Sequence, residues 1–413
     1  MKIYYVFIAL LFSVAKNNTA QTATSIANGN WTNPLTWNCT CVPMNGYNVT
    51  INHNVTLNTS MTFSSGGITV NNGASLIQDA SLNRDLWING GAFENNGTTN
   101  FRNLLFSEGS GTNAGNLNLV AFSCLDTFNN SGVINLDSMY VGEFAQFTNE
   151  VSGVLIGDSL TVDGTNASSY GTFFNNGRLI VNLVLNNGWM YNARYHESDS
   201  ITNNRQFDNL DSLKINNSFW NPGNLGNLTA ANFIIGFNYY NYGNIPFVDP
   251  ILYNYGNMEV GGSLYNIGNA SILGNSTGLI TVADSSINTG IITGYNGTYF
   301  TFCDLTPPAT APFVDVNTGT IDPNINWCTA VGLNNYTSNN EVSIFPNPNS
   351  GSFVIVANSL ESFNLIDELG RIVSTITLNE NNNFKKEIKF LQNGVYYLKS
   401  LTKNSFEKIV VTQ

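Results

Sequence analysis

Charged side chains are scarce in this 413-residue sequence: they make up 10% of it, against 42% hydrophobic residues. Histidine occurs twice and cysteine five times. Residues 17–340 contain six Lys and Arg against twenty Asp and Glu, a balance of −14. Nucleic-acid binding needs a basic face, and docking on anionic lipid needs the same charge. The sequence therefore predicts no nucleic-acid partner and no electrostatic membrane docking.

Helical periodicity and long apolar runs are also scarce. Beyond the N-terminal region no stretch is apolar and long enough to span a bilayer, so we expect no transmembrane segment in the mature chain. An apolar run at residues 3–12 follows Lys2 and precedes small and polar residues, which is the pattern of a secretory signal peptide. We expect residues 1–20 to be this peptide, with cleavage after Ala20 or, alternatively, after Ala15.

What the sequence does contain, many times over, is a turn that begins with Asn and ends with Gly. The repeats are Asn71-Asn72-Gly73, Asn95-Asn96-Gly97, Asn113-Ala114-Gly115, Asn130-Ser131-Gly132, Asn175-Asn176-Gly177, Asn186-Asn187-Gly188, Asn241-Tyr242-Gly243, Asn254-Tyr255-Gly256, Asn266-Ile267-Gly268 and Asn288-Thr289-Gly290. Short alternating strands follow them, as in a solenoid with tight corners. We predict an all-β, right-handed parallel β-helix over residues 21–330, with apolar stacks inside and Asn ladders at its corners. Tandem β-sandwiches are the competing architecture.

The two ends of the array have the character of caps. Trp31 and Trp37 lie in a Gly-x-Trp…Thr-Trp…Pro…Val-x-Ile order, which resembles the opening of many secreted Bacteroidetes β-helix proteins. Two indole rings can cover the exposed end of the first coil, which solenoids need in order to avoid edge pairing. Stacking on carbohydrate is the alternative role. At the other end, residues 315–322 finish the array.

The five cysteines allow few arrangements. Export through an oxidising periplasm permits disulfides, and Cys303 with Cys328 is the pair we expect, at the C-terminal cap. Cys39 and Cys41 can form half of a zinc site, but no second close cysteine pair exists, so we expect no metal and no cofactor. Cys124 is expected to be a buried apolar residue.

The densest polar cluster lies at residues 194–214. Arg194, His196, Glu197 and Asp199 have the groups that a β-helix polysaccharide lyase or glycosidase needs, if strand and corner aim them into one groove. A solvated loop between coils is the competing interpretation. A groove that contains His196, a carboxylate and Arg194 would favour the enzyme, and a flat face of Asn, Thr and Tyr would favour a binding protein.

Two weaker candidates remain in the body of the chain. Asp158 and Asp163 have the oxygen ligands that calcium prefers, without a recognisable loop pattern. Aromatic residues at 237–242 and 253–255 either stack on sugar faces or fill the interior and corners of the solenoid.

The last part of the chain differs in composition. Residues 341–413 contain seven Lys and Arg and seven Asp and Glu, a balance of zero. Residues 331–340 have the polar composition of a linker. Short alternating runs between Gly and Asn turns then predict a small antiparallel, immunoglobulin-like β-sandwich over residues 341–413.

Four motifs of this C-terminal domain occur in a fixed order: a Pro-Asn-Pro-x-x-Gly opening, an Asp-x-x-Gly-Arg turn, Gly-x-Tyr-x-Leu and Lys-Ile-Val. They resemble the C-terminal type A sorting domain of the bacterial type IX secretion system; an ordinary immunoglobulin-like accessory domain is the alternative. The resemblance implies export through the periplasm to the outer cell surface or beyond. It also implies that the secretion machinery recognises Pro346, Pro348, Gly351, Asp367, Gly370, Arg371, Gly394, Tyr396 and Lys408.

These observations predict an exported cell-surface or extracellular protein that is not an enzyme. Its role would be adhesive, structural or glycan-binding, with the type IX secretion machinery, extracellular glycans or surface proteins as partners. A polysaccharide lyase or glycoside hydrolase that uses residues 194–214 is the alternative.

Overall fold

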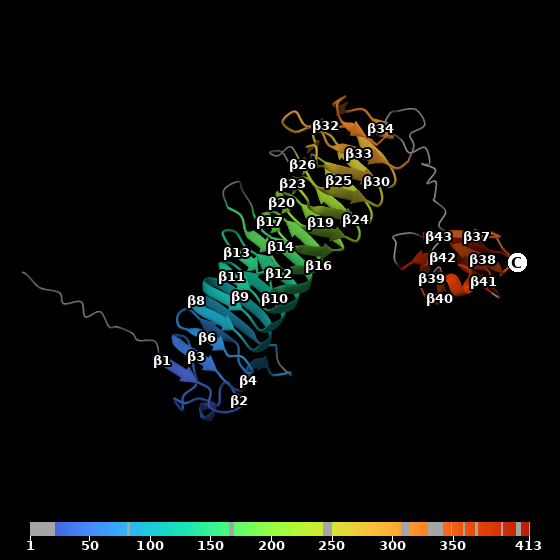
Figure 1. Cartoon of the computed structure of the whole chain (residues 1–413). Helices are drawn as coiled ribbons and strands as arrows, with labels where there is room; N and C mark the ends of the chain where they lie inside the picture. Colours follow the sequence, from blue (N-terminus) through green and yellow to red (C-terminus); the bar gives the residue numbers. More distant parts are fainter. Residues whose placement is uncertain are drawn as a thin grey trace, which may run out of the picture. The chain divides into compact units, whose positions relative to one another are not determined.

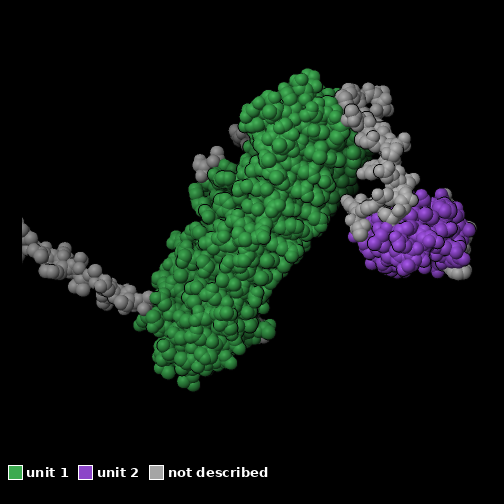
Figure 2. All heavy atoms as spheres, in the orientation of Figure 1, with its two compact units in different colours: residues 1–330 green, residues 331–413 purple. Residues whose placement is uncertain are grey.

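The computed structural model describes residues 21–412, apart from 81–82, 165–168, 243–249, 307–313, 329–341, 348, 358–359, 368–370, 390 and 402–405. The chain divides into two compact units between Ala330 and Val331 (Figure 2). The predicted signal peptide and the predicted linker lie outside the described residues.

The first unit is a solenoid whose strands form three series, here called faces 1, 2 and 3 (Figure 1). Face 1 contains β1 (Gln21–Thr24), β3 (Tyr47–Ile51), β6 (Gly67–Val70), β8 (Asp85–Asn95), β9 (Thr98–Asn113), β11 (Thr127–Asn130), β13 (Gln146–Asn149), β15 (Thr172–Asn175), β17 (Trp189–Asn192), β20 (Gln206–Asn209), β23 (Asn224–Asn227), β26 (Ile251–Asn254), β29 (Ser271–Gly274), β32 (Ile291–Gly294) and β35 (Thr320–Ile321).

Faces 2 and 3 share the longer strands with each other or with face 1. Face 2 contains β2 (Gly29–Asn30), β4 (Asn54–Leu57), β7 (Ser75–Gln78), part of β9, β10 (Asn116–Cys124), β12 (Val133–Val141), β14 (Val154–Val162), β16 (Arg178–Asn186), β18 (Tyr195–Ser198), β21 (Ser212–Ile215), β24 (Asn232–Ile235), β27 (Asn257–Val260), β30 (Leu279–Val282), β33 (Thr301–Asp304) and β36 (Asn326–Trp327). Face 3 contains β5 (Met61–Phe63), parts of β8, β9, β10, β12, β14 and β16, then β19 (Ser200–Asn203), β22 (Phe219–Asn221), β25 (Tyr239–Tyr242), β28 (Leu264–Ile267), β31 (Ser286–Asn288) and β34 (Val316–Asn317).

Each strand of a face pairs in parallel with the strand one coil further on, as β11 does with β13 and β13 with β15. This confirms the predicted parallel β-helix and excludes tandem sandwiches for the first unit. Side chains alternate inward and outward, so equivalent residues of successive coils stack inside. Phe128, Phe147 and Phe173 form such a stack, with ring centroids 5.9 and 5.1 Å apart.

Buried asparagines form two ladders along the corners, as the sequence predicts. The first ladder ends the strands of face 1 and contains Asn95, Asn113, Asn130, Asn149, Asn175, Asn192, Asn209, Asn227 and Asn254. The second ladder ends the strands of face 3 and contains Asn186, Asn203, Asn221, Asn241, Asn266, Asn288 and, at its exposed end, Asn317. Each Nδ2 donates to the Oδ1 of the asparagine in the next coil. Because a buried amide needs partners for its donors and its acceptor, these ladders satisfy their members from coil to coil.

Many ladder asparagines, such as Asn113 and Asn130, are followed two places later by a glycine, and this glycine has a steric cause. A Cβ on Gly115 would strike the carbonyl oxygen of Gly97 in the preceding coil, and one on Gly132 would strike that of Gly115. The turn at Asn71 is an exception that sequence alone does not distinguish. Val70, and not Asn71, occupies the inward position in register with Asn95, so Asn71 lies outside the ladder.

The N-terminal end of the solenoid is closed by the two tryptophans. Trp31 and Trp37 are fully buried, with ring centroids 5.1 Å apart in an edge arrangement. The Trp31 indole donates to Pro43 O at 3.0 Å and the Trp37 indole to Trp31 O at 2.9 Å. Both rings are therefore part of the core, as a cap requires, and present no surface for stacking on carbohydrate.

The second unit contains two antiparallel sheets. One is formed by β37 (Val342–Phe345), β38 (Phe353–Ala357) and β41 (Lys385–Ile388), the other by β40 (Ile372–Leu378), β39 (Glu361–Asp367), β42 (Gly394–Ser400) and β43 (Phe406–Val411). Inward residues of both sheets, such as Ile355, Leu365 and Leu398, belong to one buried cluster. This agrees with the small β-sandwich predicted from the sequence.

Candidate functional site

His196, the candidate base of the enzyme alternative, lies inside the solenoid. It is fully buried in β18, in register with Leu179 of the preceding coil and Leu213 of the next. Its Nε2 lies 2.7 Å from Ser198 Oγ, and its ring stacks on Phe207 at 5.9 Å. Burial disfavours the charged imidazolium and lowers the pKa of His196 to about 3.

Glu197 points the opposite way, because adjacent residues of a strand face opposite sides. Its carboxylate accepts from Tyr195 Oη and from Lys214 Nζ, each at 2.6 Å. These two hydrogen bonds, that to Lys214 first, lower the pKa of Glu197. Lys214 thus neutralises Glu197 on the outer surface, one coil above it.

The other two candidate residues lie at corners. The Arg194 guanidinium donates to Val151 O at 3.1 Å, and Asp199 Oδ1 accepts from Asn216 Nδ2 at 3.1 Å. The structure therefore brings Glu197 and Lys214 together but does not bring His196 to them. It offers no common groove for His196, a carboxylate and Arg194 among the described residues.

Asp158 and Asp163 are likewise occupied separately. Asp158 Oδ1 accepts from Asn182 Nδ2 at 3.0 Å, while Asp163 accepts a short hydrogen bond from Tyr140 Oη. This bond is the main cause that raises the pKa of Tyr140 to about 12. The part of the chain that the structure describes holds no cluster of three or more His, Cys, Asp or Glu residues suited to a metal ion.

The structure pairs the cysteines in two disulfides. Cys303 is joined to Cys328 at the C-terminal end of the solenoid, and Cys39 is joined to Cys41 next to the tryptophan cap. Cys124 is free and fully buried, and burial raises the pKa of its thiol to about 12. Its protonated thiol therefore acts as the small apolar side chain that the sequence predicts.

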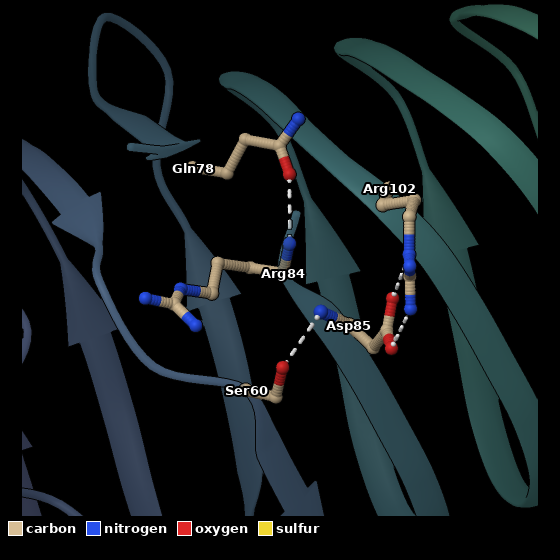
Figure 3. A network of polar contacts seen from close by, with 5 residues as sticks. All are labelled: Ser60, Gln78, Arg84, Asp85 and Arg102. Carbon is tan, nitrogen blue, oxygen red and sulfur yellow. Dashed lines mark hydrogen bonds and ion pairs between the residues drawn. The ribbon is translucent and has the colours of Figure 1, made fainter. Parts of the chain in front are cut away.

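An ion pair that the sequence did not single out joins β8 and β9. Arg102 Nε and Nη2 donate to the two carboxylate oxygens of Asp85 at 2.9 and 2.7 Å (Figure 3). Ser60 accepts from the Asp85 backbone amide, and Gln78 from that of Arg84, whose guanidinium points away from the pair (Figure 3). These contacts tie three coils together.

The aromatic residues at 237–242 and 253–255 divide between inside and outside. Tyr239 is buried, whereas Tyr240 faces outward on face 3 between Trp220 and Tyr265. These three rings are nearly parallel, at 3° and 8°, with centroids 5.7 and 4.8 Å apart, so each covers the face of the next. Tyr253, Tyr255 and Tyr295 instead form a tilted outer cluster, with centroid distances of 5.5–6.2 Å.

A third outward aromatic cluster was missed by the sequence reasoning. Phe174 of β15 lies against Trp189 and Tyr191 of β17 at 6.3 and 5.9 Å, with interplanar angles of 57° and 67°. The available signal for this cluster was the alternation of inward and outward residues before each ladder asparagine. A residue two places before a ladder asparagine faces inward, as Phe173 and Met190 do. The residue directly before the asparagine therefore faces outward, as Phe174 and Tyr191 do.

The sorting-motif residues hold the C-terminal sandwich together locally. Asp367 Oδ1 and Oδ2 accept from the Arg371 backbone amide and Nε at 2.9 and 2.8 Å, which closes the turn between β39 and β40. Tyr396 is buried and donates to Gln392 O at 3.0 Å. Gly351 has φ of +94°, a conformation that side chains rarely adopt.

The opening motif owes its contacts to an asparagine that the sequence reasoning did not select. Asn347 donates to Lys408 O at 2.7 Å and accepts from the Val410 amide at 2.9 Å, which fastens the start of the domain to β43. The side chain of Lys408 itself is exposed. Pro346 is described, while Pro348 and Gly370 lie outside the described residues.

Comparison with known protein families identifies this second unit. Residues 343–412 match the family described as the secretion system C-terminal sorting domain. The chain is thus a β-helix protein sorted by the type IX secretion system, exported for secretion or attachment at the cell surface, and the domain implies a Bacteroidetes source. No curated protein and no solved structure matches the chain. Among the described residues, no helix has the length and apolar character to cross a membrane.

Proposed function

We propose that this exported protein is not an enzyme and acts on the cell surface or outside the cell by adhesion or glycan binding. The observation that carries the proposal is the outward placement of aromatic rings on consecutive rigid strands. Aromatic side chains with an apolar body and a polar tip are suited to recognition surfaces, and solenoids bind through extended faces of this kind.

The alternative, a lyase or hydrolase, needs an acid, a base and a cation around one bond. His196 is buried among Leu179, Leu213 and Phe207, and Glu197 lies on the other side of the strand. This separation favours binding over cleavage.

The test uses the full chain with a panel of acidic and neutral polysaccharides. New reducing ends and unsaturated-uronate absorbance report cleavage, and retention on the same immobilised glycans reports binding. We expect retention without cleavage. Cleavage that is lost in Glu197→Gln would establish the enzyme instead, and the absence of both signals would leave protein adhesion or scaffolding as the function.

A further inference from the structure

We propose that face 1 holds a neutral glycan chain along the solenoid axis, stacked on Trp189 and Tyr191 at one end and on Tyr253 at the other. The inference rests on the proposed function, because it names the site and the ligand class for glycan binding. Four features carry it: the tilt of the rings, the fixed carboxylate beside them, the register of the two aromatic clusters and the charge of the surface.

In the cluster of Phe174, Trp189 and Tyr191, the rings do not cover each other's faces. Phe174 meets Trp189 and Tyr191 at 57° and 67°, whereas Trp220, Tyr240 and Tyr265 on face 3 cover each other in a nearly parallel stack. A sugar ring packs its apolar C–H face on an aromatic face. Face 1 therefore offers stacking surfaces that the face 3 stack offers only at its ends.

A fixed hydrogen-bonding group lies one coil above the rings. Asp208 of β20 accepts from the Trp189 indole at 2.9 Å and from Gln206 Nε2 at 2.6 Å. Among the described residues it belongs to none of the ion pairs. Each carboxylate oxygen thus keeps lone-pair capacity for a hydroxyl donor, and its position next to the indole is set before any ligand binds.

The two aromatic clusters share one column of the face. Tyr191, Asp208, Gly226 and Tyr253 are in register on β17, β20, β23 and β26, which follow one another in Figure 1. Strands stack at about 4.8 Å, so Tyr191 and Tyr253 are about 14 Å apart along the axis. A chain of several sugars spans this distance, whereas a disaccharide contacts one cluster only.

Gly226 makes room for the carboxylate between the clusters. A Cβ at this position would lie 2.9 Å from Asp208 Oδ1 and 3.6 Å from Leu228 Cδ2. Asp208 therefore leans over a position without a side chain. Substitution of Gly226 by alanine would displace this carboxylate while both aromatic clusters stay in place.

The charge of the surface favours neutral glycans over acidic ones. Asp208 presents a negative group to the ligand, and residues 17–340 have an excess of fourteen acidic residues. Two arginines of the same part of the solenoid are engaged with rings: Arg205 lies over Tyr170 at 4.5 Å and Arg178 over Tyr195 at 5.5 Å. A uronate or a sulfate ester would face repulsion at the carboxylate, whereas hydroxyl groups are donors to it.

The experiment measures binding of cello-oligosaccharides of two to six glucose units to the full chain by titration calorimetry, with oligogalacturonate as the acidic counterpart. We expect affinity to rise with chain length. Trp189→Ala should lower the affinity for the hexasaccharide at least tenfold, and Tyr253→Ala should lower it for the hexasaccharide but not for the disaccharide. Gly226→Ala should weaken the binding of both saccharides. Tyr240→Ala on face 3 is the matched control, and its affinity should be unchanged.

Three results would overturn the site. They are wild-type affinity for the hexasaccharide in both Trp189→Ala and Tyr253→Ala, tighter binding of oligogalacturonate than of cello-oligosaccharides, and no binding of any cello-oligosaccharide. Circular dichroism of each variant separates lost folding from lost contacts. The proposed function is judged separately by retention of the wild-type chain on the wider glycan panel. Retention there that the face 1 variants do not change would leave glycan binding standing and place it elsewhere.

Discussion

Face 3 ends its strands differently in the two halves of the solenoid. In β10, β12 and β14 the last inward residue is Cys124, Val141 or Val162, whereas from Asn186 onward it is an asparagine of the second ladder. The corners that follow do not divide in the same way. Nine residues separate Val162 from the next strand at Thr172, but two separate Cys124 from Thr127 and two separate Asn186 from Trp189.

The second amide hydrogen shows what an asparagine adds at the end of such a strand. Asn186 Nδ2 donates to Asn203 Oδ1 and also to Gln206 O, the first residue of the following strand one coil on. Asn175 does the same with Asn192 and Tyr195 O. An asparagine therefore adds a hydrogen bond across the corner that an apolar residue cannot make, and it needs neighbours in both directions because an unpaired buried amide is costly.

The largest effect is expected from an interruption of a ladder. Asn175→Leu keeps the volume of the side chain but removes the donor of both Asn192 Oδ1 and Tyr195 O, as well as one acceptor of Asn149. Each buried orphan costs about 1–3 kcal/mol, so we expect a loss of about 2–6 kcal/mol in the free energy of urea unfolding.

Asn95→Val is the matched control for this variant. Asn95 begins the first ladder, its Oδ1 has no hydrogen-bond partner, and Val70 precedes it in register. Its replacement leaves Asn113 Oδ1 without its donor but also removes the unpaired Asn95 Oδ1. The loss in the free energy of unfolding should therefore be clearly smaller. Equal losses in the two variants would show that the ladder is not a connected unit.

A smaller effect comes from an attempt to extend the second ladder. Val162→Asn places an amide in register with Asn186, whose Oδ1 can accept from it, whereas Val141→Asn places one between Cys124 and Val162. Both variants bury a polar group, at about 1–3 kcal/mol without partners. We expect Val162→Asn to cost at least ~1 kcal/mol less than Val141→Asn in the same unfolding measurement. The opposite order would contradict the role given to the neighbouring amide.

The repeat and its ladders could be predicted because both follow from local sequence. An Asn-x-Gly turn marks the corner residue and the residue that must lack a Cβ, although ladder members such as Asn149, Asn192 and Asn209 have no such glycine. The position of individual side chains could not be predicted without the register between coils. His196 lies in a polar run, and only its alignment with Leu179 and Leu213 shows that it faces inward. Trp189 and Tyr191 were missed for the same reason, since the parity that places them outside is set by Asn192.

His196 provides a test of the same comparison at acidic pH, because it is an inward polar residue of face 2 without a ladder. Its folded pKa of about 3 lies below the usual value of 6.5, so the unfolded chain binds the additional proton between these pH values. Stability is therefore greatest above pH 6.5 and falls as the pH decreases towards 3, by up to ~1.4 kcal/mol per pH unit for this group. His196→Leu, which matches its neighbours Leu179 and Leu213, should remove this part of the pH dependence of unfolding. An unchanged slope in that variant would mean that carboxylates elsewhere dominate the acid response. A reduced slope would show that an inward polar group outside a ladder is tolerated only while it stays neutral, whereas the ladder amides, which do not titrate, are satisfied at any pH.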